Sequence, residues 1–313
     1  MKSLILYIAV PCYNEEACLD ETTKRLKEKI SVLSKKKIIS DASKIVYVDD
    51  DSKDKTWEKI SGYDDQVIGL KLSHNRGHQN ALLAGLMYSK DHADVVISMD
   101  ADLQDDIDAI DKFIEKYNDG CEIVYGVRSE RKKDTYFKKH TALMFYKTMN
   151  WLGAETVYNS ADYRLMSKRA LDELAKYDEV NLFLRGLVPL LGFKTGEARY
   201  ARAERFAGES KYPLKKMLNF AWDGITSFSV KPIRMVLSLG FIVFIASLII
   251  MLYSVIAKVV GQTVSGWTFI ICSIWLLGGI QMISIGLVGE YIGKIYAEVK
   301  HRPKYIIEKV KDK

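Results

Sequence analysis

The sequence predicts an α/β fold with a mostly parallel central sheet, followed by an amphipathic juxtamembrane helix and two transmembrane helices. Three observations predict this architecture. From residue 1 to about 126, short apolar runs alternate with stretches of helical spacing, as in successive β-α-β units. Polar clusters follow the apolar runs, where the site of such a sheet lies. Two long, almost uncharged segments come near the end.

The expected strands and helices of the first part alternate in order along the chain. Strands are expected at Leu4–Val10, Lys44–Val48, Val67–Leu72, Asp94–Met99 and Glu122–Tyr125. The helices between them are expected at Asn14–Lys37, Thr56–Ile60, Ala81–Ser89 and about 107–118. After residue 130 the alternation loosens, and we expect a helix at Tyr136–Leu152, a strand at Ala161–Met166, a helix at Asn181–Leu191 and a strand or hairpin at Phe193–Arg205.

Bulk composition excludes several classes of protein. The chain has 313 residues, enough for one or two domains. Its net charge of +6 is modest for this length, so we expect no nucleic-acid partner. The four cysteines have no zinc-site spacing, which predicts reduced thiols in a cytosolic compartment. The first apolar run is too short for a signal peptide and is interpreted as a strand.

An acidic cluster follows the run Val95–Met99. Asp100 and Asp102 stand at i and i+2, and Asp105 and Asp106 follow them. Carboxylates at the end of a buried strand suit Mg²⁺ or Mn²⁺ together with a phosphate. The alternative is a helix N-cap region, where aspartate is also common.

A second acidic cluster, Asp49 to Asp51, follows the strand expected at Lys44–Val48. These carboxylates would accept hydrogen bonds from a base or ribose, although a solvated turn explains the same pattern. The sequence has no phosphate-binding Gly-x-x-x-x-Gly-Lys-Ser/Thr loop and no recognisable nucleophilic triad. His74 and His78 are interpreted as polar residues at the rim of the site or on the surface.

Six cations crowd the 18 residues from Arg199 to Lys216. Arginine forks suit phosphate oxygens, whereas a basic patch beside a membrane also attracts anionic head groups. Because the patch directly precedes the membrane segments, a phosphate attached to a lipid satisfies both interpretations.

The membrane segments are expected at Val236–Ala257 and Trp267–Gly289, each long enough to cross a bilayer. Lysine and arginine flank the pair on both outer sides, which predicts a cytoplasmic location for the N-terminal domain and both termini. Glycines at 278, 279, 286 and 289 would allow close helix contact and a homo-oligomer. The stretch Lys215–Val230 is amphipathic, and either a membrane-interface helix or a core-facing helix explains it.

These features divide the chain into four predicted parts. They are a cytoplasmic domain at 1–212, an amphipathic helix at 213–234, a transmembrane hairpin at 235–290 and a basic cytoplasmic tail at 291–313.

Several motifs, in this order, resemble those of the family 2 glycosyltransferases of GT-A fold. They are Val10-Pro-Cys-Tyr-Asn-Glu-Glu16, Val48-Asp-Asp-Asp-Ser-Lys-Asp54, Asn75-Arg-Gly-His78, Asp100-Ala-Asp-Leu-Gln104 and Asp162-Tyr-Arg-Leu-Met166. The stretch from Arg202 to Tyr212 and the two spans resemble the polyprenyl-phosphate branch, which includes bactoprenol glucosyltransferases and dolichol-phosphate mannose synthases. One departure is Asp51, where the family usually has glycine; aspartate tolerates a positive φ there at some cost.

The resemblance implies a function and a set of roles. A nucleotide sugar, with UDP-glucose favoured, would give a single sugar to the phosphate of undecaprenyl phosphate, a polyprenyl phosphate, at the bacterial plasma membrane, with inversion. GlcNAc, galactose and GDP-mannose stay open as donor types. The implied roles are nucleotide binding by Pro11, Tyr13, Glu15, Asp49, Asp50, Asp100 and Arg128, metal binding by Asp100 and Asp102, and acceptor-phosphate binding by Arg202, Arg205, Ser210 and Lys211.

Asp162 matches the family's candidate base, with Arg164 and Asp102 as its catalytic companions. A phosphate monoester has a second pKa of about 6, so the acceptor is already largely dianionic at neutral pH. We therefore expect Asp162 mainly to position a substrate. Two other classes of protein explain the sequence less well. A sugar-nucleotide pyrophosphorylase needs no membrane hairpin, and an inactive membrane scaffold needs no intact acidic motifs.

Overall fold

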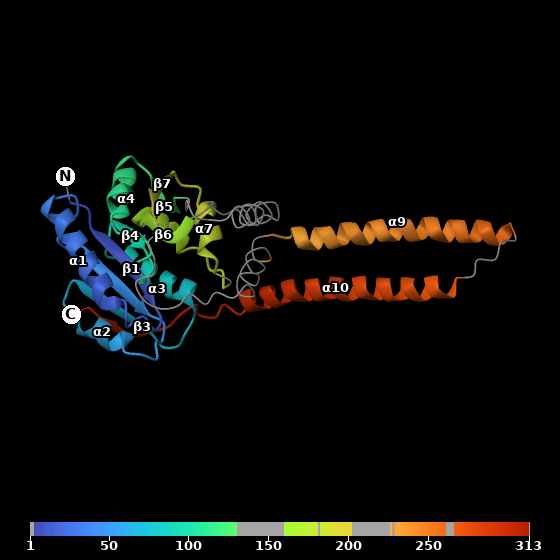
Figure 1. Cartoon of the computed structure of the whole chain (residues 1–313), viewed down its shortest axis with the longest axis horizontal. Helices are drawn as coiled ribbons and strands as arrows, with labels where there is room; N and C mark the ends of the chain where they lie inside the picture. Colours follow the sequence, from blue (N-terminus) through green and yellow to red (C-terminus); the bar gives the residue numbers. More distant parts are fainter. Residues whose placement is uncertain are drawn as a thin grey trace.

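A twisted sheet forms the centre of the globular part of the molecule (Figure 1). The computed structural model describes residues 3–129, 160–180, 182–201, 226, 229–260 and 266–312. Within them the sheet has eight strands in the order β7-β5-β6-β4-β1-β2-β3-β8. The strands are β1 (Leu6–Cys12), β2 (Lys44–Asp49), β3 (Val67–Leu72), β4 (Val95–Ser98), β5 (Ile123–Arg128), β6 (Ser160–Ser167), β7 (Thr195–Tyr200) and β8 (Ile307–Lys311).

The predicted mostly parallel sheet is confirmed. β1 runs parallel to both β2 and β4, β2 to β3, and β5 to β7. β6 lies antiparallel between β4 and β5, and β8 lies antiparallel beside β3. Every residue of β1 is buried, because helices cover both faces of the sheet and a strand so placed needs apolar side chains on both sides.

Six helices of the described chain pack against the sheet, and two more extend away from it. The packed helices are α1 (Leu19–Lys35), α2 (Thr56–Gly62), α3 (His78–Lys90), α4 (Ala109–Asn118), α6 (Lys168–Leu174) and α7 (Leu184–Leu190). Leu26 of α1 and Phe113 of α4 belong to the core on one face, whereas Leu82 of α3 and Leu171 of α6 belong to the core on the other. The result is a three-layer α/β domain whose parallel strands all end at one edge.

One helix of the domain, α6, was not predicted from the sequence. α6 follows β6 directly, and Ser167 caps it by accepting a hydrogen bond from the backbone N–H of Ala170 at 3.0 Å. The helix expected at Tyr136–Leu152 and most of the amphipathic stretch Lys215–Val230 lie outside the described residues.

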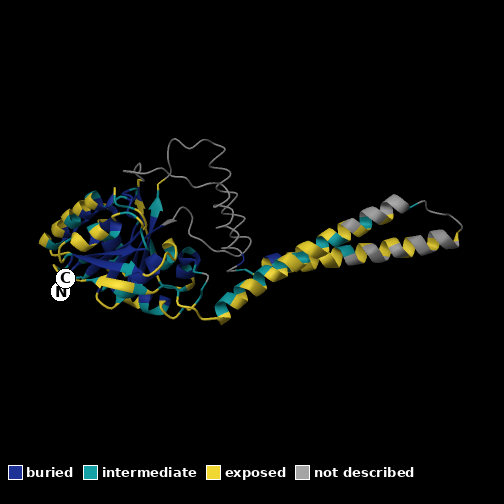
Figure 2. Cartoon of the chain, turned by 90° about the horizontal axis from the view of Figure 1, so that it is seen from below, coloured by how far each residue is buried: buried dark blue, intermediate teal, exposed yellow. Residues whose placement is uncertain are grey.

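Two long helices, α9 (Lys231–Val259) and α10 (Trp267–Val299), form a hairpin that projects from the domain (Figure 1). Large apolar side chains along both helices are exposed (Figure 2), among them Leu237, Phe241, Ile249, Leu276, Ile283 and Ile292. Among the described residues, one segment, Leu276–Val299, has the length and composition of a membrane span. The structure thus supports one span directly, and the second predicted span is not established by it.

Within the described part of this chain, four glycines of α10 make no close contact with another helix. A Cβ atom added at Gly278, Gly279, Gly286 or Gly289 would meet no atom within 4 Å. α10 also continues past the predicted end of the span at Gly289, as far as Val299.

The range 291–313 differs from the predicted basic tail. Its first part completes α10, and residues 307–311 form β8, which pairs with β3 from Gly69 to Leu72. Lys311 donates hydrogen bonds from Nζ to the carbonyl oxygens of Tyr63, Asp64 and Val67, at 2.8 to 2.9 Å. The C-terminal segment is therefore an integral edge strand of the central sheet.

Candidate active site

The loops that follow β1, β2, β3 and β4 meet at the carboxyl edge of the sheet. Parallel pairing brings them together: Cys12 at the end of β1 lies opposite Asp49 at the end of β2, and the N–H of Asp50 bonds to the carbonyl of Cys12 at 2.9 Å. The Asn14 side chain then accepts a hydrogen bond from the N–H of Lys53 at 2.8 Å. The motifs that are separated in sequence thus form one connected rim.

The acidic turn after β2 contains two buried carboxylates and one strained residue. Oδ1 of Asp49 accepts the N–H of Ser52 at 3.1 Å, while its Oδ2 is buried with no protein partner among the described residues. Burial raises the pKa of Asp49. Asp51 has φ of 60°, which confirms the expected positive φ at the position where the family usually has glycine.

Asp50 holds the loop that leads into α3. Its two carboxylate oxygens accept the backbone N–H groups of Arg76 and Gly77, at 2.7 and 2.8 Å. Gly77 has φ of +84°, a conformation that glycine adopts without strain. This carboxylate therefore fixes the start of α3, and with it His78, at the site.

The loop after β4, which carries Asp100 and Asp102 and is called the DxD loop below, concentrates negative charge. The side chain of Asp102 is buried, and its Oδ1 accepts the N–H of Gln104 at 3.1 Å. Burial raises the pKa of Asp100 to about 6, and the neighbouring carboxylates of Asp105 and Asp162 add to the rise against the opposing charge of His78. A site that holds carboxylates this close favours a cation.

Asp162 on β6 is the centre of a buried ionic network. Its Oδ1 accepts hydrogen bonds from Arg164 at 2.7 Å and from Nε of Arg185 at 3.1 Å. Its Oδ2 accepts them from Arg185 at 3.0 Å and from the amide of Gln79 at 3.3 Å. Burial alone would raise the pKa of this carboxyl, but the hydrogen bond from His78 and the charges of Arg185 and Arg164 hold it well below its usual range. Asp162 is therefore ionised and a weak base.

His78 joins the two acidic groups. Its Nε2 lies 3.6 Å from Oδ1 of Asp100 and 3.5 Å from Oδ2 of Asp162. Burial opposes the charged imidazolium, yet the hydrogen bond to Asp162 and the charge of Asp100 raise its pKa overall. The rim position expected from the sequence is confirmed, and the geometry adds a bridging contact.

The far side of the site is formed by β5 and β7. Tyr200, at the end of β7, donates to Oδ1 of Asp105 at 2.5 Å, and Arg128 lies 3.5 Å from the same oxygen. Nε of Arg128 also donates to the Tyr200 hydroxyl at 3.3 Å. Arg128 thus stands beside the DxD loop, where a donor phosphate is expected.

A family model now matches this chain. The model described as "Glycosyl transferase family 2" covers residues 7–175, and a second, "GtrB C-terminal hairpin", covers residues 231–295. The chain belongs to glycosyl transferase family 2. It is therefore a glycosyltransferase, and its α/β domain is of GT-A type.

The relatives of this glycosyltransferase match it over almost the whole length. It is 56% identical over 307 residues to the uncharacterized glycosyltransferase YkoT of Bacillus subtilis, covering 97% of this chain and 91% of that one. It is 39% identical over 311 residues to a prophage bactoprenol glucosyl transferase homolog of Escherichia coli K12, covering 97% and 98%. It is also 39% identical over 313 residues to the bactoprenol glucosyl transferase of Shigella phage SfV, covering 98% and 99%.

A solved structure of Staphylococcus aureus TarS in complex with UDP-GlcNAc is a distant neighbour of this glycosyltransferase. It is 17% identical, the match covers 72% of this chain and 66% of that one, and the TM-score is 0.43. At that distance it carries no argument about the site.

The glycosyltransferase brings most of its predicted donor residues together. Asp49, Asp50, Asp100 and Asp102 lie on adjoining loops, and Arg128 and Asp162 face the same region from β5 and β6. Pro11 is buried in β1, and Tyr13 is 46% exposed at the loop that follows it. The predicted acceptor residues Arg202, Arg205, Ser210 and Lys211 lie outside the described residues.

Three residues of the site were not predicted: Gln79, Arg185 and Tyr200. Gln79 and Arg185 bind Asp162, while Tyr200 binds Asp105, which belongs to the predicted acidic cluster. Gln79 follows the Asn75–His78 motif and so had a sequence signal. Arg185 and Tyr200 had none, because their roles depend on how α7 and β7 pack.

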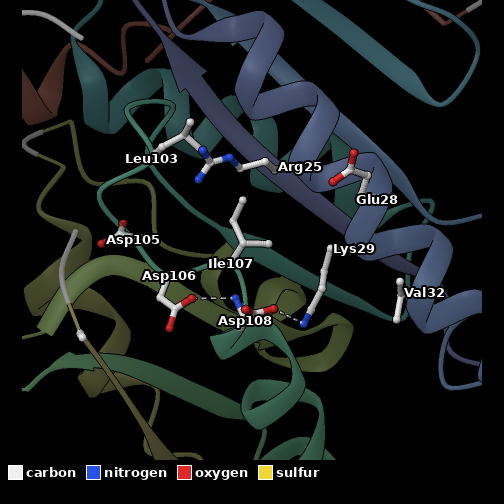
Figure 3. Close-up of a pocket in the computed structure, with 10 residues that line it drawn as sticks. Arg25, Glu28, Lys29, Val32, Leu103, Asp105, Asp106, Ile107 and Asp108 are labelled. Carbon is white, nitrogen blue, oxygen red and sulfur yellow. Dashed lines mark hydrogen bonds and ion pairs between the residues drawn. The ribbon is translucent and has the colours of Figure 1, made fainter. Parts of the chain in front are cut away.

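A pocket of about 440 Å³ borders the same loop on the side of α1 (Figure 3). Arg25 and Lys29 of α1 line it together with Asp105, Asp106 and Asp108, and Lys29 binds Asp108 at 2.7 Å. Lys29 thus neutralises Asp108 in this wall of the pocket. Asp100 and Asp102 are not among the residues that line this pocket.

The carboxylates of Asp100 and Asp102 fit a divalent cation that is bound together with a substrate. No group of three or more metal-ligating side chains occurs among the residues that the structure describes. Mg²⁺ in phosphate-handling sites takes one or two carboxylates and completes its shell with phosphate oxygens and water. The half-buried Asp100 and the buried Asp102 supply those two carboxylates.

Proposed function

We propose that this glycosyltransferase moves one sugar from a UDP-sugar, with UDP-glucose first among the candidates, to the phosphate of a polyprenyl phosphate such as undecaprenyl phosphate. The observation that carries the proposal is the 39% identity to bactoprenol glucosyl transferases over 97–98% of the chain, together with the matching hairpin. The product is a lipid-linked sugar for modification of a cell-envelope glycan.

Donor binding is assigned to the carboxyl edge of the sheet. Asp49, with a buried oxygen that has no partner among the described residues, is the acceptor offered to the base or ribose of the nucleotide. Pro11 lies near the end of the neighbouring strand β1, and Tyr13 and Glu15 lie in the loop that follows it. Asp50 acts through the Arg76–Gly77 backbone that it holds.

Asp100 and Asp102 would hold Mg²⁺ or Mn²⁺ against the donor diphosphate. When bound, the cation neutralises the charge that develops on the nucleotide diphosphate as it leaves. Arg128 adds a fixed positive charge on the opposite side of the DxD loop. Metal coordination and charge thus stabilise the leaving group, while this chain's own residues orient the reactants.

Asp162 acts by positioning. Its pKa is well below the usual range because two arginines and His78 bind it, so it accepts a proton poorly. The acceptor phosphate is largely dianionic at neutral pH and needs no strong base. Asp162, Arg164 and Arg185 form a rigid wall that aligns sugar and phosphate for a single inverting displacement.

The acceptor phosphate is assigned to Arg202, Arg205, Ser210 and Lys211. Support comes from the path of the chain: β7 ends at Tyr200, which touches Asp105, so the basic stretch begins beside the donor site. From there the chain leads to the hairpin. A lipid phosphate at the membrane surface thus meets the donor at the end of β7.

Membrane topology and domain limits complete the proposal. A catalytic domain at 1–212 and an amphipathic helix at 213–234 precede a two-span hairpin at 235–290, with both termini cytoplasmic. The exposed apolar surface of α9 and α10 supports burial in a bilayer.

The decisive experiment supplies undecaprenyl phosphate and a panel of UDP- and GDP-sugars to the full-length protein in membranes. Mass analysis of the lipid is expected to give a hexosyl phosphate lipid with UDP-glucose, and a chelator is expected to abolish it. Transfer from another donor would change the sugar assignment. No lipid product from any donor would overturn the proposed function.

A further inference from the structure

The end of α10 contacts the segment that leads into the active site. Glu298, one residue before the end of α10, accepts the backbone N–H of Val180 through both carboxylate oxygens, at 2.9 and 2.8 Å. Lys304, between α10 and β8, donates to the carbonyl of Tyr177 at 2.6 Å. Two side chains at the C-terminal end of the hairpin, Glu298 and Lys304, therefore hold the backbone at positions 177 and 180.

The same segment continues into the residues that bind Asp162. The N–H of Leu184 donates to Gln79 at 3.2 Å, and its carbonyl accepts Nη1 of Arg164 at 3.2 Å. Arg185, the next residue, donates to both oxygens of Asp162. The distance along the chain from Val180 to Arg185 is only five residues.

The negative charge of Glu298 destabilises the end of α10, and its hydrogen bonds to Val180 offset this effect. A carboxylate in the last turn of a helix opposes the negative end of the helix dipole. The last turn of α10 has no basic residue that would offset it. A charged acceptor on a backbone N–H makes a strong hydrogen bond. The charge of Glu298 thus stabilises the contact with Val180 and does not stabilise α10 itself.

We infer that Glu298 and Lys304 are positioning residues: they hold the backbone at Tyr177 and Val180 against the C-terminal end of the hairpin and so align Arg185, which follows in the chain, with Asp162. This inference rests on the proposed function for its kinetic consequence. Structurally, it makes the reaction geometry depend on the placement of α10 relative to the domain.

The test compares Glu298→Ala, which removes the acceptor, with Glu298→Gln, which keeps one acceptor oxygen. Glu308→Ala is the matched control, since Glu308 pairs with Lys71 at 3.3 Å on the opposite edge of the sheet. Full-length variants in membranes are assayed with UDP-glucose and undecaprenyl phosphate. Amide hydrogen exchange is followed in peptides that cover residues 177–187.

We expect Glu298→Ala to lose amide protection at 177–187 and roughly tenfold in kcat, with KM for the donor nearly unchanged, because alignment rather than donor binding is lost. Glu298→Gln should recover most of both losses, and Glu308→Ala should behave like the wild type. If Glu298→Ala does not fold, Lys304→Met is expected to give the same pattern.

Two outcomes would overturn the inference: unchanged exchange at 177–187 in Glu298→Ala, or lost protection with kcat within twofold of the wild type. An equal loss in Glu308→Ala would also overturn it. A wild type that is inactive with every donor would instead overturn the proposed function, and the exchange measurement would still decide whether α10 holds this segment.

Discussion

Asp162 illustrates how a single residue's environment decides its role. The side chain is 5% exposed and Arg164 beside it is 2% exposed, so this ion pair is largely shielded from water. A carboxylate held in this way keeps its charge and its direction, which suits alignment and opposes proton transfer.

Asp162→Asn separates positioning from base catalysis. We expect kcat to fall by roughly ten- to a hundredfold because alignment suffers, and the loss should not change with rising pH. Asp102→Asn is the comparison, with a larger loss that follows from weaker metal binding. The measurement is single-turnover transfer with the donor bound. An Asp162→Asn enzyme as inactive as Asp102→Asn at high pH, with donor still bound, would instead favour an obligate base.

The same carboxyl predicts an acid-dependent loss of stability. Its pKa is depressed in the folded protein, so the unfolded chain binds the proton more readily and the stabilisation is complete above the unfolded pKa of about 4. Removing the charge with Asp162→Ala leaves Arg164 buried without its ionic partner, which is expected to cost about 3–5 kcal/mol at neutral pH. Thermal unfolding of both proteins should show this difference shrinking as the pH falls below about 4; a difference that grows in acid would contradict the assignment.

At the scale of elements, β8 protects an edge of the sheet that would otherwise be open. β3 pairs with β2 on one side and with β8 on the other. A Cβ atom added at Gly69 of β3 would lie 2.6 Å from Ile60 and 3.5 Å from Lys311, so the strands and α2 pack closely here. Without β8, the backbone groups of β3 would lose their partners.

Deleting residues 306–313 is expected to lower the melting temperature of the domain and to promote aggregation, because β3 becomes an exposed edge strand. Hydrogen exchange in β3 should rise. Lys309→Ala serves as the control, because the Lys309 side chain is exposed and pairs with the neighbouring Glu308 at 3.8 Å. Unchanged exchange in β3 after the deletion would show that β8 does not protect it.

The sequence was informative where chemistry and spacing are local. The strands and helices before residue 126 were predicted to within a few residues, since each has its own apolar period and its own turn. The meeting of the acidic loops at one edge followed from parallel strands alone. β8 was not predicted, because its five residues pair with a strand more than 230 positions earlier. The placement of Arg185 likewise depends on the packing of the short helix α7.

At the scale of the whole molecule, α10 is longer than a bilayer requires. Its 33 residues span about 50 Å, against a hydrocarbon core of about 30 Å. The excess lies at the domain end, where Lys294 contacts Thr226 and Tyr291 contacts Ser229. The helix thus extends from the membrane region directly to the catalytic domain.

Cysteine labelling in intact cells tests the two-span topology. Val260, directly after the end of α9, is 68% exposed, so Val260→Cys is expected to react with a membrane-impermeant maleimide from outside. Lys309→Cys on β8 should react only after lysis. Of the four native cysteines, Cys12, Cys18 and Cys121 are buried, and the wild-type protein is labelled in parallel to measure the background. Labelling of both positions only after lysis would exclude the hairpin crossing.

The two strands that flank the membrane hairpin, β7 and β8, are the two outer strands of one sheet. Under the proposed topology, the chain leaves the domain for the hairpin after one outer strand and returns to it at the other. Anchoring in the bilayer would then make the encounter with a lipid acceptor a search in two dimensions. The rate of that encounter is then governed by the areal density of the lipid and by lateral diffusion, and a cell would tune it through the amount of acceptor in the leaflet.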